Sequence, residues 1–302
     1  MVADVRVMSA ADEGKTPLIT VVLPVFNGGE YLRLAVRSIL EQSFDEWELL
    51  IIDDGSSDSA VDALRDGADG RIRFFQDRLN KGLAARLNEA IDLARGEFFA
   101  RMDQDDVSHP ERLSRQLRQL RADSSLDLVG TQCITISSRN EIIGTLPRAE
   151  SHEEISARPW VGFYMPHPTW MGRTEWFRKN RYASPGPYCC EDQELLLRTH
   201  KTSRFYVLPE RLLAYRLRER FSWNKNWRTR KTLYGIQTRF FAARMEYLNV
   251  LKATAMFLVR VGWDARVLLG QVLLGSAVHR KAKPFMQKAE IEIWKCLLRP
   301  KK

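Results

Sequence analysis

At 302 residues, the chain is long enough for one large domain with an appendage, or for two domains. Its 44% hydrophobic and 28% charged residues are ordinary for a folded soluble protein, and it contains no internal repeat or low-complexity tract. The formal net charge of +9 is unevenly spread, because residues 211–302 carry 21 Lys and Arg against 5 Asp and Glu, whereas residues 1–210 have a net charge of −7. A basic tail of this kind suits an anionic partner.

The first residues and the cysteines indicate the cellular compartment. Residues 1–16 mix acidic and basic side chains and lack an apolar core, so we interpret 1–17 as a flexible lead-in and not as a signal peptide. The four cysteines are Cys133, Cys189, Cys190 and Cys296, and none has metal-ligand spacing. Because Cys189 and Cys190 are adjacent, a disulfide between them is unfavourable. We expect four free thiols in a reducing cytoplasm.

The first hundred residues alternate between strand and helix patterns. Apolar runs predict strands at 19–25, 47–52, 72–76 and 97–102. Helical periodicity predicts helices at 30–42 and 60–64, and a third that opens at Asn80-Lys81-Gly82 and ends before Gly96. This rhythm predicts an α/β fold with a twisted, mainly parallel sheet covered by helices on both faces.

Polar motifs follow the strands of this predicted sheet. Asp53 and Asp54 end the second strand, and Asp103-Gln104-Asp105-Asp106 ends the fourth. In such sheets, ligands bind outside the carboxyl ends of the strands. Three carboxylates in four residues repel one another, and Mg²⁺ or Mn²⁺ would relieve that repulsion while holding phosphates. We therefore expect a metal-assisted phosphate site at this edge.

The rest of the chain is less regular before it becomes helical. We predict a helix at 111–121, a strand at 128–136 that pairs with 140–146, a helix at 195–200 opened by Glu191-Asp192-Gln193-Glu194, and short strands at 205–208 and 212–215. From Trp223 the chain is helical and basic. Residues 253–278 are the most apolar part, but charged residues interrupt them, and the remaining run is shorter than the roughly 20 residues that span a bilayer.

Read together, the motifs resemble those of the family 2 glycosyltransferases of the GT-A fold. The resemblance covers residues 18–220 in order, and it rests on 24–32, Ser38-Ile39-Leu40-Glu41-Gln42, 53–58, Asn80-Lys81-Gly82-Leu83-Ala84, Gly96-Glu97, 103–106, His167-Pro168-Thr169 and 191–194. Each motif alone is common, whereas the ordered series is specific.

The resemblance implies a nucleotide-sugar donor, commonly a UDP-sugar, a divalent metal (Mn²⁺ or Mg²⁺) and inversion at the anomeric carbon. By position, the nucleotide-sugar site would comprise Pro24, Val25, Phe26, Asn27, Asp53, Asp54, Gly82 and Asp103. Asp105 would be the main metal ligand, and Asp103 would lie by the ribose and the metal. Asp192 would be the general base, with Glu191 supporting it or meeting the acceptor.

Two departures from the family pattern narrow the expected activity. Many relatives have a His two positions after a Tyr-Arg pair, whereas Tyr215-Arg216-Leu217 leads here to Arg218, which could supply only positive charge. The Gln-x-x-Arg-Trp motif of processive synthases is absent from the expected region. A single-transfer enzyme is therefore favoured over a polymerase.

Structural interpretations compete with each functional one. Asp53-Asp54-Gly55 alone is a turn signal, and Asp192 belongs to an acidic cluster that the helix dipole would favour at a helix start. We interpret His167, between two prolines, as structural and not as catalytic. The basic tail lacks a recognisable nucleic-acid reading motif, which favours an anionic membrane surface as its partner.

We therefore expect a GT-A domain at 18–220 and a helical, basic C-terminal region at 221–302. The expected function is sugar transfer to a glycan or lipid-linked hydroxyl acceptor for cell-surface polysaccharide or glycolipid synthesis, at the cytoplasmic face of the membrane. The alternative is a catalytically silent nucleotide-sugar-binding or assembly subunit. A third possibility, a nucleotidyltransferase, would need a longer and more basic Gly-rich loop after the first strand than this chain has.

Overall fold

The computed structural model describes residues 16–187, 189–217, 222–274 and 286–299, with side chains in the third range described up to 270. Most of the expected lead-in therefore lies outside the described residues. The strands are β1 (Ile19–Val25), β2 (Trp47–Asp53), β3 (Ile72–Gln76), β4 (Phe98–Arg101), β5 (Val107–Ser108), β6 (Leu128–Ile136), β7 (Ile142–Thr145), β8 (Met171–Arg173) and β9 (Phe205–Arg216). The helices are α1 (Tyr31–Leu40), η1 (Asp62–Leu64), α2 (Leu83–Leu93), α3 (Arg112–Ala122), α4 (His152–Ser156), η2 (His167–Thr169), α5 (Thr174–Lys179), α6 (Glu191–Thr199), α7 (Trp223–Ala242), α8 (Tyr247–Leu274) and α9 (Lys288–Leu297).

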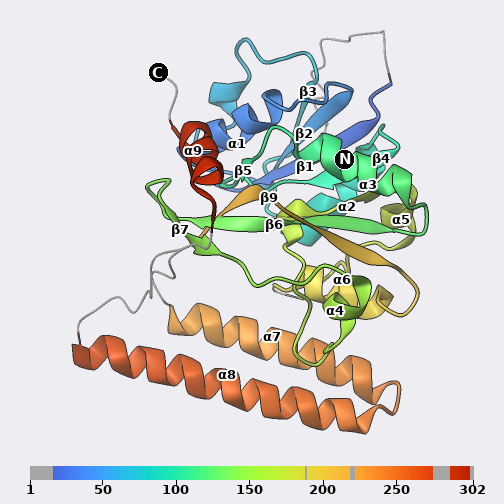
Figure 1. Cartoon of the computed structure of the whole chain (residues 1–302), viewed down its shortest axis with the longest axis vertical. Helices are drawn as coiled ribbons and strands as arrows, with labels where there is room; N and C mark the ends of the chain where they lie inside the picture. The colour runs from blue at the N-terminus through green and yellow to red at the C-terminus, as the bar shows by residue number, and fades with distance from the viewer. Residues whose placement is uncertain (1–15, 188, 218–221, 275–285, 300–302) are drawn as a thin grey trace.

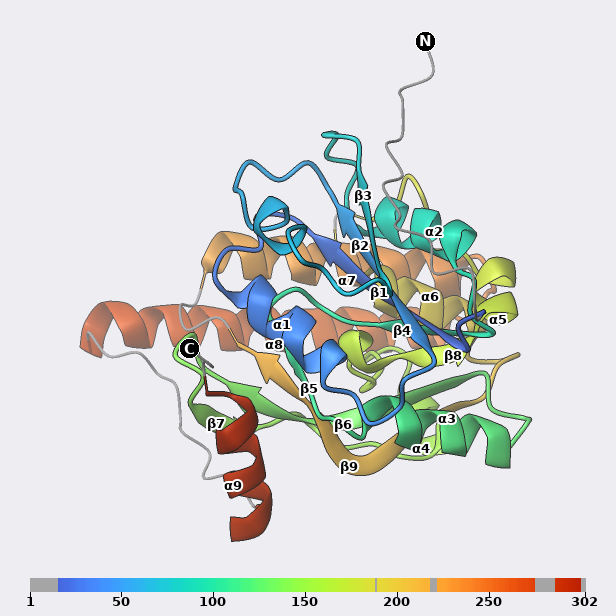
Figure 2. The same cartoon turned by 90° about the horizontal axis from the view of Figure 1, so that it is seen from above.

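The first four long strands form the parallel half of one sheet, in the order β3-β2-β1-β4 (Figures 1 and 2). Every residue of β1 and β2 is buried, as expected of strands covered on both faces. The parallel register pairs Val25 with Asp53, so the polar loops after β1 and β2 leave the sheet side by side. The predicted α/β architecture is confirmed.

The second half of the sheet is mixed. It continues as β8-β6-β9-β5, with β7 paired to β6, and only the β6–β9 pair in this half is parallel. The two short strands expected at 205–208 and 212–215 are one strand, β9, whose pairing jumps from Leu208 to Arg211. Pro209 cannot donate a ladder hydrogen bond, which explains why the sequence reads as two strands. Ser108, in the two-residue strand β5, pairs with Leu213 of β9.

Helices cover both faces of the sheet, and each face has its own apolar core. On one face, α1 and α3 bury Leu32, Ile39 and Leu113 against alternate residues of β1. On the other face, α2, α5 and α6 pack against residues of the opposite parity. A strand alternates its side chains between the two faces, so β1 contributes to both cores.

The C-terminal region divides between a hairpin and a helix that returns to the sheet. Helices α7 and α8 lie side by side below α4 and α6 in Figure 1, and α7 joins the core through Ile236 and Phe241. Helix α9 lies against the sheet edge, where Trp294 is buried and Arg37 donates hydrogen bonds to the Leu297 and Arg299 carbonyls. Among the described residues, we find no helix with the length and apolarity needed to cross a bilayer.

Candidate functional site

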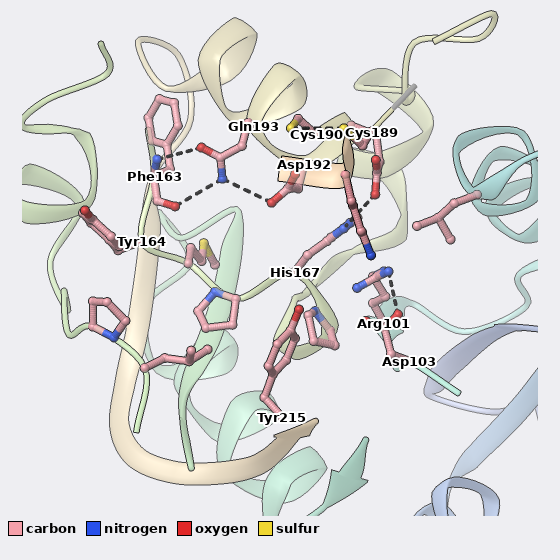
Figure 3. Close-up of a pocket in the computed structure, with 18 residues that line it drawn as sticks. Arg101, Asp103, Phe163, Tyr164, His167, Cys189, Cys190, Asp192, Gln193 and Tyr215 are labelled. Atoms are coloured by element: carbon pink, nitrogen blue, oxygen red, sulfur yellow. Dashed lines mark hydrogen bonds and ion pairs between the residues drawn. The ribbon is translucent and has the colours of Figure 1, made fainter. Parts of the chain in front are cut away.

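A cavity of about 580 Å³ lies between the end of β4 and the start of α6 (Figure 3). Three of the predicted site residues, Asp103, Glu191 and Asp192, line this cavity. Its wall is formed by Leu83, Arg101, Asp103, Leu146, Pro147, Phe163, Tyr164, Met165, Pro166, His167, Pro168, Cys189, Cys190, Glu191, Asp192, Gln193, Tyr215 and Lys225. Residues far apart in the chain thus share one site.

The end of β4 contributes a buried ion pair. Arg101 is 3% exposed, and its Nη2 atom lies 2.7 Å from Oδ1 of Asp103. The remaining guanidinium nitrogens, Nε and Nη1, are buried and have no hydrogen-bond partner among the described residues. Burial opposes the charge of Arg101, but the carboxylates of Asp103, Glu191 and Asp192 help to raise its pKa, so it stays charged. The cavity wall therefore includes a fixed cation.

The turn after Asp103 is held by Arg216. The Arg216 backbone N–H donates to Oδ1 of Asp106 at 2.8 Å, and its Nε donates to the Asp105 carbonyl at 2.7 Å. Asp106 is buried, and burial together with the charges of Asp103 and Asp105 raises its pKa. The side chain of Asp105 is partly exposed, so of the three carboxylates only that of Asp106 is fully enclosed by protein.

The first turn of α6 contributes Glu191 and Asp192. Oδ2 of Asp192 accepts a hydrogen bond from Nε2 of Gln193 at 3.1 Å. The Gln193 amide also pairs with both backbone groups of Phe163, at 2.8 and 3.2 Å. Because this amide is anchored to another wall of the cavity, it holds the Asp192 carboxylate in one orientation (Figure 3).

His167 lies between Tyr182 and the first turn of α6. Its Nε2 lies 2.7 Å from the Tyr182 hydroxyl, and its Nδ1 lies 3.6 Å from Oε1 of Glu191. Burial, and then the charge of Arg101, lowers the pKa of His167 to about 3, so the imidazole is neutral at pH 7. The residue interpreted as structural thus also lies within the site.

The strand-end loops predicted to meet the nucleoside lie outside this cavity, but they are tied to the Asp103 turn. The Phe26 backbone and the Gln104 amide exchange hydrogen bonds of 2.8 and 3.1 Å. Oδ1 of Asn27 accepts from the backbone N–H and hydroxyl of Ser57. Pro24 and Val25 end β1 beneath this loop, and the Phe26 ring is 48% exposed.

Asp53 and Asp54 are both buried, and protein groups occupy both carboxylates. Asp53 accepts from Ser56 N–H at 2.9 Å and from Gln76 Nε2 at 2.7 Å. Asp54 accepts from the backbone N–H groups of Lys81 and Gly82 and from Nε of Arg86. Gly82 has φ +86°, a conformation that disfavours side chains, at the start of α2. Asp54 thus positions the turn at Gly82.

Several site residues were not predicted, among them Arg101, Tyr182, Gln193 and Arg216. Arg101 had a detectable signal, because it is a charged residue at the end of the apolar run 98–100 of a buried strand. The sequence pattern offered no comparable signal for Tyr182. Arg218, which stands where many relatives have a His, lies outside the described residues.

Among the described residues, two groups of side chains are candidates for holding a cation. Asp103 and Asp105 are the predicted pair. A second group, His167, Glu191 and Asp192, has ligand atoms all within 4.8 Å of one another. Arg101 is ion-paired with Asp103 and also interacts with Glu191 and Asp192, so its positive charge acts on both groups.

Sequence comparison identifies relatives over the first part of the chain. A family model described as Glycosyl transferase family 2 matches residues 20–181. The chain is 36% identical to the bifunctional glycosyltransferase pgtA of Dictyostelium discoideum over 148 residues, which are 43% of this chain and 19% of that protein. It is 36% identical to the putative glycosyltransferase EpsE of Bacillus subtilis (strain 168) over 118 residues, 38% of this chain and 42% of that protein. The match thus spans less than half of each relative.

Solved structures extend the similarity to the whole fold. TarS 1–349 of S. aureus in complex with UDP-GlcNAc aligns with a TM-score of 0.60 and 19% identity, covering 92% of this chain and 79% of that one. The mannosyltransferase PcManGT from Pyrobaculum calidifontis, in complex with GDP-Man and Mn²⁺, aligns with a TM-score of 0.57 and 18% identity, covering 96% and 84%. These alignments show a common GT-A fold.

Proposed function

Because the chain belongs to glycosyl transferase family 2, we propose that it transfers a sugar from a nucleotide-sugar donor to a hydroxyl acceptor, with inversion at the anomeric carbon. One observation carries the proposal: Asp103, just after β4, and Asp192, in the first turn of α6, line the same cavity. A single in-line displacement needs stabilisation of the leaving diphosphate on one side of the sugar and a base on the other. In this proposal, Asp103 serves the diphosphate side and Asp192 serves the acceptor side.

In the proposed reaction, the Asp192 carboxylate takes the proton of the acceptor hydroxyl as its oxygen attacks the anomeric carbon. The bond from that carbon to the diphosphate oxygen breaks, and the nucleoside diphosphate leaves with the bonding electrons. Gln193 keeps the Asp192 carboxylate oriented. Neutral His167 lies beside Glu191, where it can help to bind acceptor hydroxyls.

A UDP-sugar is the proposed donor. The loops at Phe26, Asn27 and Asp53 would surround the uracil and ribose, and their link through Gln104 connects them to the diphosphate end of the site. TarS has been solved with UDP-GlcNAc, which supports a UDP-sugar as the donor. PcManGT has been solved with GDP-Man, so a GDP-sugar is the competing choice.

Asp103 and Asp105 are the proposed ligands of Mn²⁺ or Mg²⁺. Their side chains are partly exposed at the turn, and crowding of three carboxylates contributes to the raised pKa of Asp106, so a cation fits the charge of the site. When bound, the metal would neutralise charge on the diphosphate. Arg101 adds a permanent positive charge from the protein itself.

The proposed acceptor is lipid-linked, and the exposed face of α8 supports a membrane location. This face comprises Leu248 (65% exposed), Leu251 (67%), Leu258 (62%), Val259 (65%), Trp263 (62%) and Leu269 (57%). Their spacing places them on one side of a helix about 42 Å long. An apolar stripe of this length on a monomer marks an interaction surface.

Two charged residues of α8, Arg260 and Asp264, point away from this face. Asp264 pairs with Arg230 of α7 at 3.0 Å, and Arg260 donates to the Val161 carbonyl at 2.6 Å. Residues 222–274 carry nine Lys and Arg against two Asp and Glu, and the exposed Arg266 has its guanidinium carbon 5.8 Å from the centre of the Trp263 ring on the apolar face. An apolar face flanked by basic residues suits the surface of an anionic bilayer. We place this protein at the cytoplasmic face of such a membrane.

A donor panel tests the proposal. The full chain is incubated with UDP- and GDP-sugars, with and without Mn²⁺, and nucleotide release is measured in the presence of lipid-linked sugar acceptors. Acceptor-dependent release of one nucleotide that requires the metal supports the proposal. Donor binding without release against every acceptor would instead support a silent sugar-nucleotide-binding or assembly subunit.

A further inference from the structure

Two adjacent cysteines line the cavity immediately before Glu191 and Asp192. Cys189 and Cys190 are both partly buried free thiols, and their sulfur atoms are 3.7 Å apart. Neither has a role in the proposed transfer. A disulfide requires a sulfur separation of about 2.05 Å, so the two thiols are near to one another but unbonded.

The backbone brings both sulfurs to the same place. Consecutive side chains of an extended chain point to opposite sides, but Cys190 adopts a left-handed conformation, with φ 68° and ψ 30°, as the residue before α6. Both thiols therefore contact Thr229 of α7: the Cys189 sulfur lies 3.7 Å from its hydroxyl, and the Cys190 sulfur lies 4.0 Å from its carbonyl oxygen. Non-glycine residues rarely adopt this conformation.

The two thiols have unequal acidity. The pKa of Cys189 is lowered, because Cys190 donates a hydrogen bond to its sulfur, and the pKa of Cys190 is raised for the same reason. A thiolate is the reactive form of cysteine, and a neighbouring thiol can resolve its oxidation product. The other two cysteines lack this arrangement, because Cys133 is buried and Cys296 is on α9.

We propose that Cys189 and Cys190 are a peroxide-sensitive dithiol that forms a reversible disulfide and thereby stops sugar transfer. The Cys189 thiolate attacks hydrogen peroxide, forming a sulfenic acid and releasing hydroxide, which takes a proton to become water. The Cys190 thiol then attacks the sulfenic sulfur and loses its proton, and a second water leaves. The cysteines lose two electrons, which reduce the peroxide. The effect of the disulfide on sugar transfer rests on the proposed function, whereas the formation of the disulfide does not.

The disulfide would act directly on the proposed base. The Cys190 carbonyl accepts the Glu194 N–H at 3.0 Å and so belongs to the first turn of α6, which carries Glu191 and Asp192. Closing the ring must rotate Cys190 and move this turn. Adjacent Cα atoms are about 3.8 Å apart, less than in ordinary disulfides, so the bond is strained and easily reduced. The adjacency that disfavours a structural disulfide thus favours a transient one.

The test treats the reduced full chain with hydrogen peroxide and follows the peptide containing both cysteines by mass spectrometry after alkylation, alongside transfer activity. We expect this peptide to lose two hydrogen atoms and resist alkylation, while transfer falls roughly tenfold or more, the scale on which misplaced catalytic groups slow reactions. Dithiothreitol should restore both. Disulfide mapping needs neither donor nor acceptor, so it is read independently of the proposed function.

Two variants and one control complete the test. Cys189→Ser and Cys190→Ser should each prevent the reversible loss, whereas Cys296→Ser, which alters the exposed thiol on α9, should leave it unchanged. The proposal is overturned if peroxide produces no Cys189–Cys190 disulfide. It is equally overturned if the disulfide forms without loss of transfer, or if the reversible loss persists in Cys189→Ser.

Discussion

Arg101 Nη2 lies 2.7 Å from Asp103 Oδ1, so the strand that delivers the proposed metal-binding turn also carries a buried cation into the same cavity. Within the part of the chain that the structure describes, two further nitrogens of Arg101 have no partner, although the residue is almost completely enclosed. Burying a charge is costly unless it is paired. The arrangement therefore places a fixed positive charge beside the cavity, where it would favour an anionic ligand.

Replacing this arginine should affect transfer more than folding. For Arg101→Met, we expect kcat/KM for transfer to fall by about two orders of magnitude, the typical cost of losing one donor to developing negative charge. The free energy of unfolding should change by less than about 2 kcal/mol, because Asp103 is partly exposed and can be solvated. Steady-state kinetics and urea unfolding measure the two effects. Arg101→Lys, which keeps the charge, should retain part of the activity.

Asp192→Asn tests the proposed base. Loss of a general base should lower kcat by about 10²–10⁴-fold, with donor affinity unchanged, because the amide keeps the shape of the carboxylate. Glu194→Gln is a matched control in the same helix turn, since Glu194 pairs with Arg198 and does not line the cavity. Full activity in Asp192→Asn would remove the base assignment.

Asp105→Ala tests the metal site. We expect this variant to lose transfer and to bind the donor more weakly in Mn²⁺, because a carboxylate ligand of a hard cation is missing. Isothermal titration with and without a chelator measures the effect. In the wild type, chelation should weaken donor binding, whereas in the variant it should change little. Donor affinity that is independent of both metal and Asp105 would contradict the assignment.

His167 should make stability depend on pH. Its pKa is about 3 when folded and 6.5 unperturbed, so the unfolded chain takes up the proton first and acid favours unfolding. The resulting contribution to stability is complete above pH 6.5 and is lost progressively as the pH falls towards 3. At pH 5 the loss is about 2 kcal/mol.

Denaturant unfolding of the wild type and His167→Asn at several pH values isolates this contribution. The difference between the two curves should shrink on acidification, because only the wild type carries the buried imidazole. Taking the difference also cancels the contributions of His109 and His200, whose pKa values are lowered mainly by burial. A difference that is constant between pH 7.5 and 5 would refute the prediction.

The exposed face of α8 should bind anionic vesicles. Leu251→Glu combined with Leu258→Glu places two charges on this face and should reduce sedimentation with phosphatidylglycerol vesicles about tenfold or more. Wild-type binding should weaken in high salt and with phosphatidylcholine alone. Ile293→Glu is the control, because Ile293 is 49% exposed on α9 and lies outside this face. Equal binding of the double variant would refute the proposal.

Strands and helices with strong local patterns were predictable. Runs rich in apolar residues located β1, β3 and β6 at the residues observed, because strand positions that face the two cores favour apolar side chains. The motif series located the loops at the carboxyl ends of the strands, because these motifs directly follow predicted strands in the sequence. Local patterns failed at Pro209, where pairing with β6 carries one strand through a residue that cannot donate.

Sequence alone determined the strand–helix alternation, the acidic turns and the family to which they belong, because these are written in neighbouring residues. Only the tertiary structure decided that Asp103 and Asp192 share a cavity, that Arg101 is enclosed beside it, and that α8 turns Arg260 and Asp264 inward while several of its leucines stay exposed. Those features depend on which distant segments pack together. Side-chain burial and pairing follow from that packing, and no local pattern specifies it.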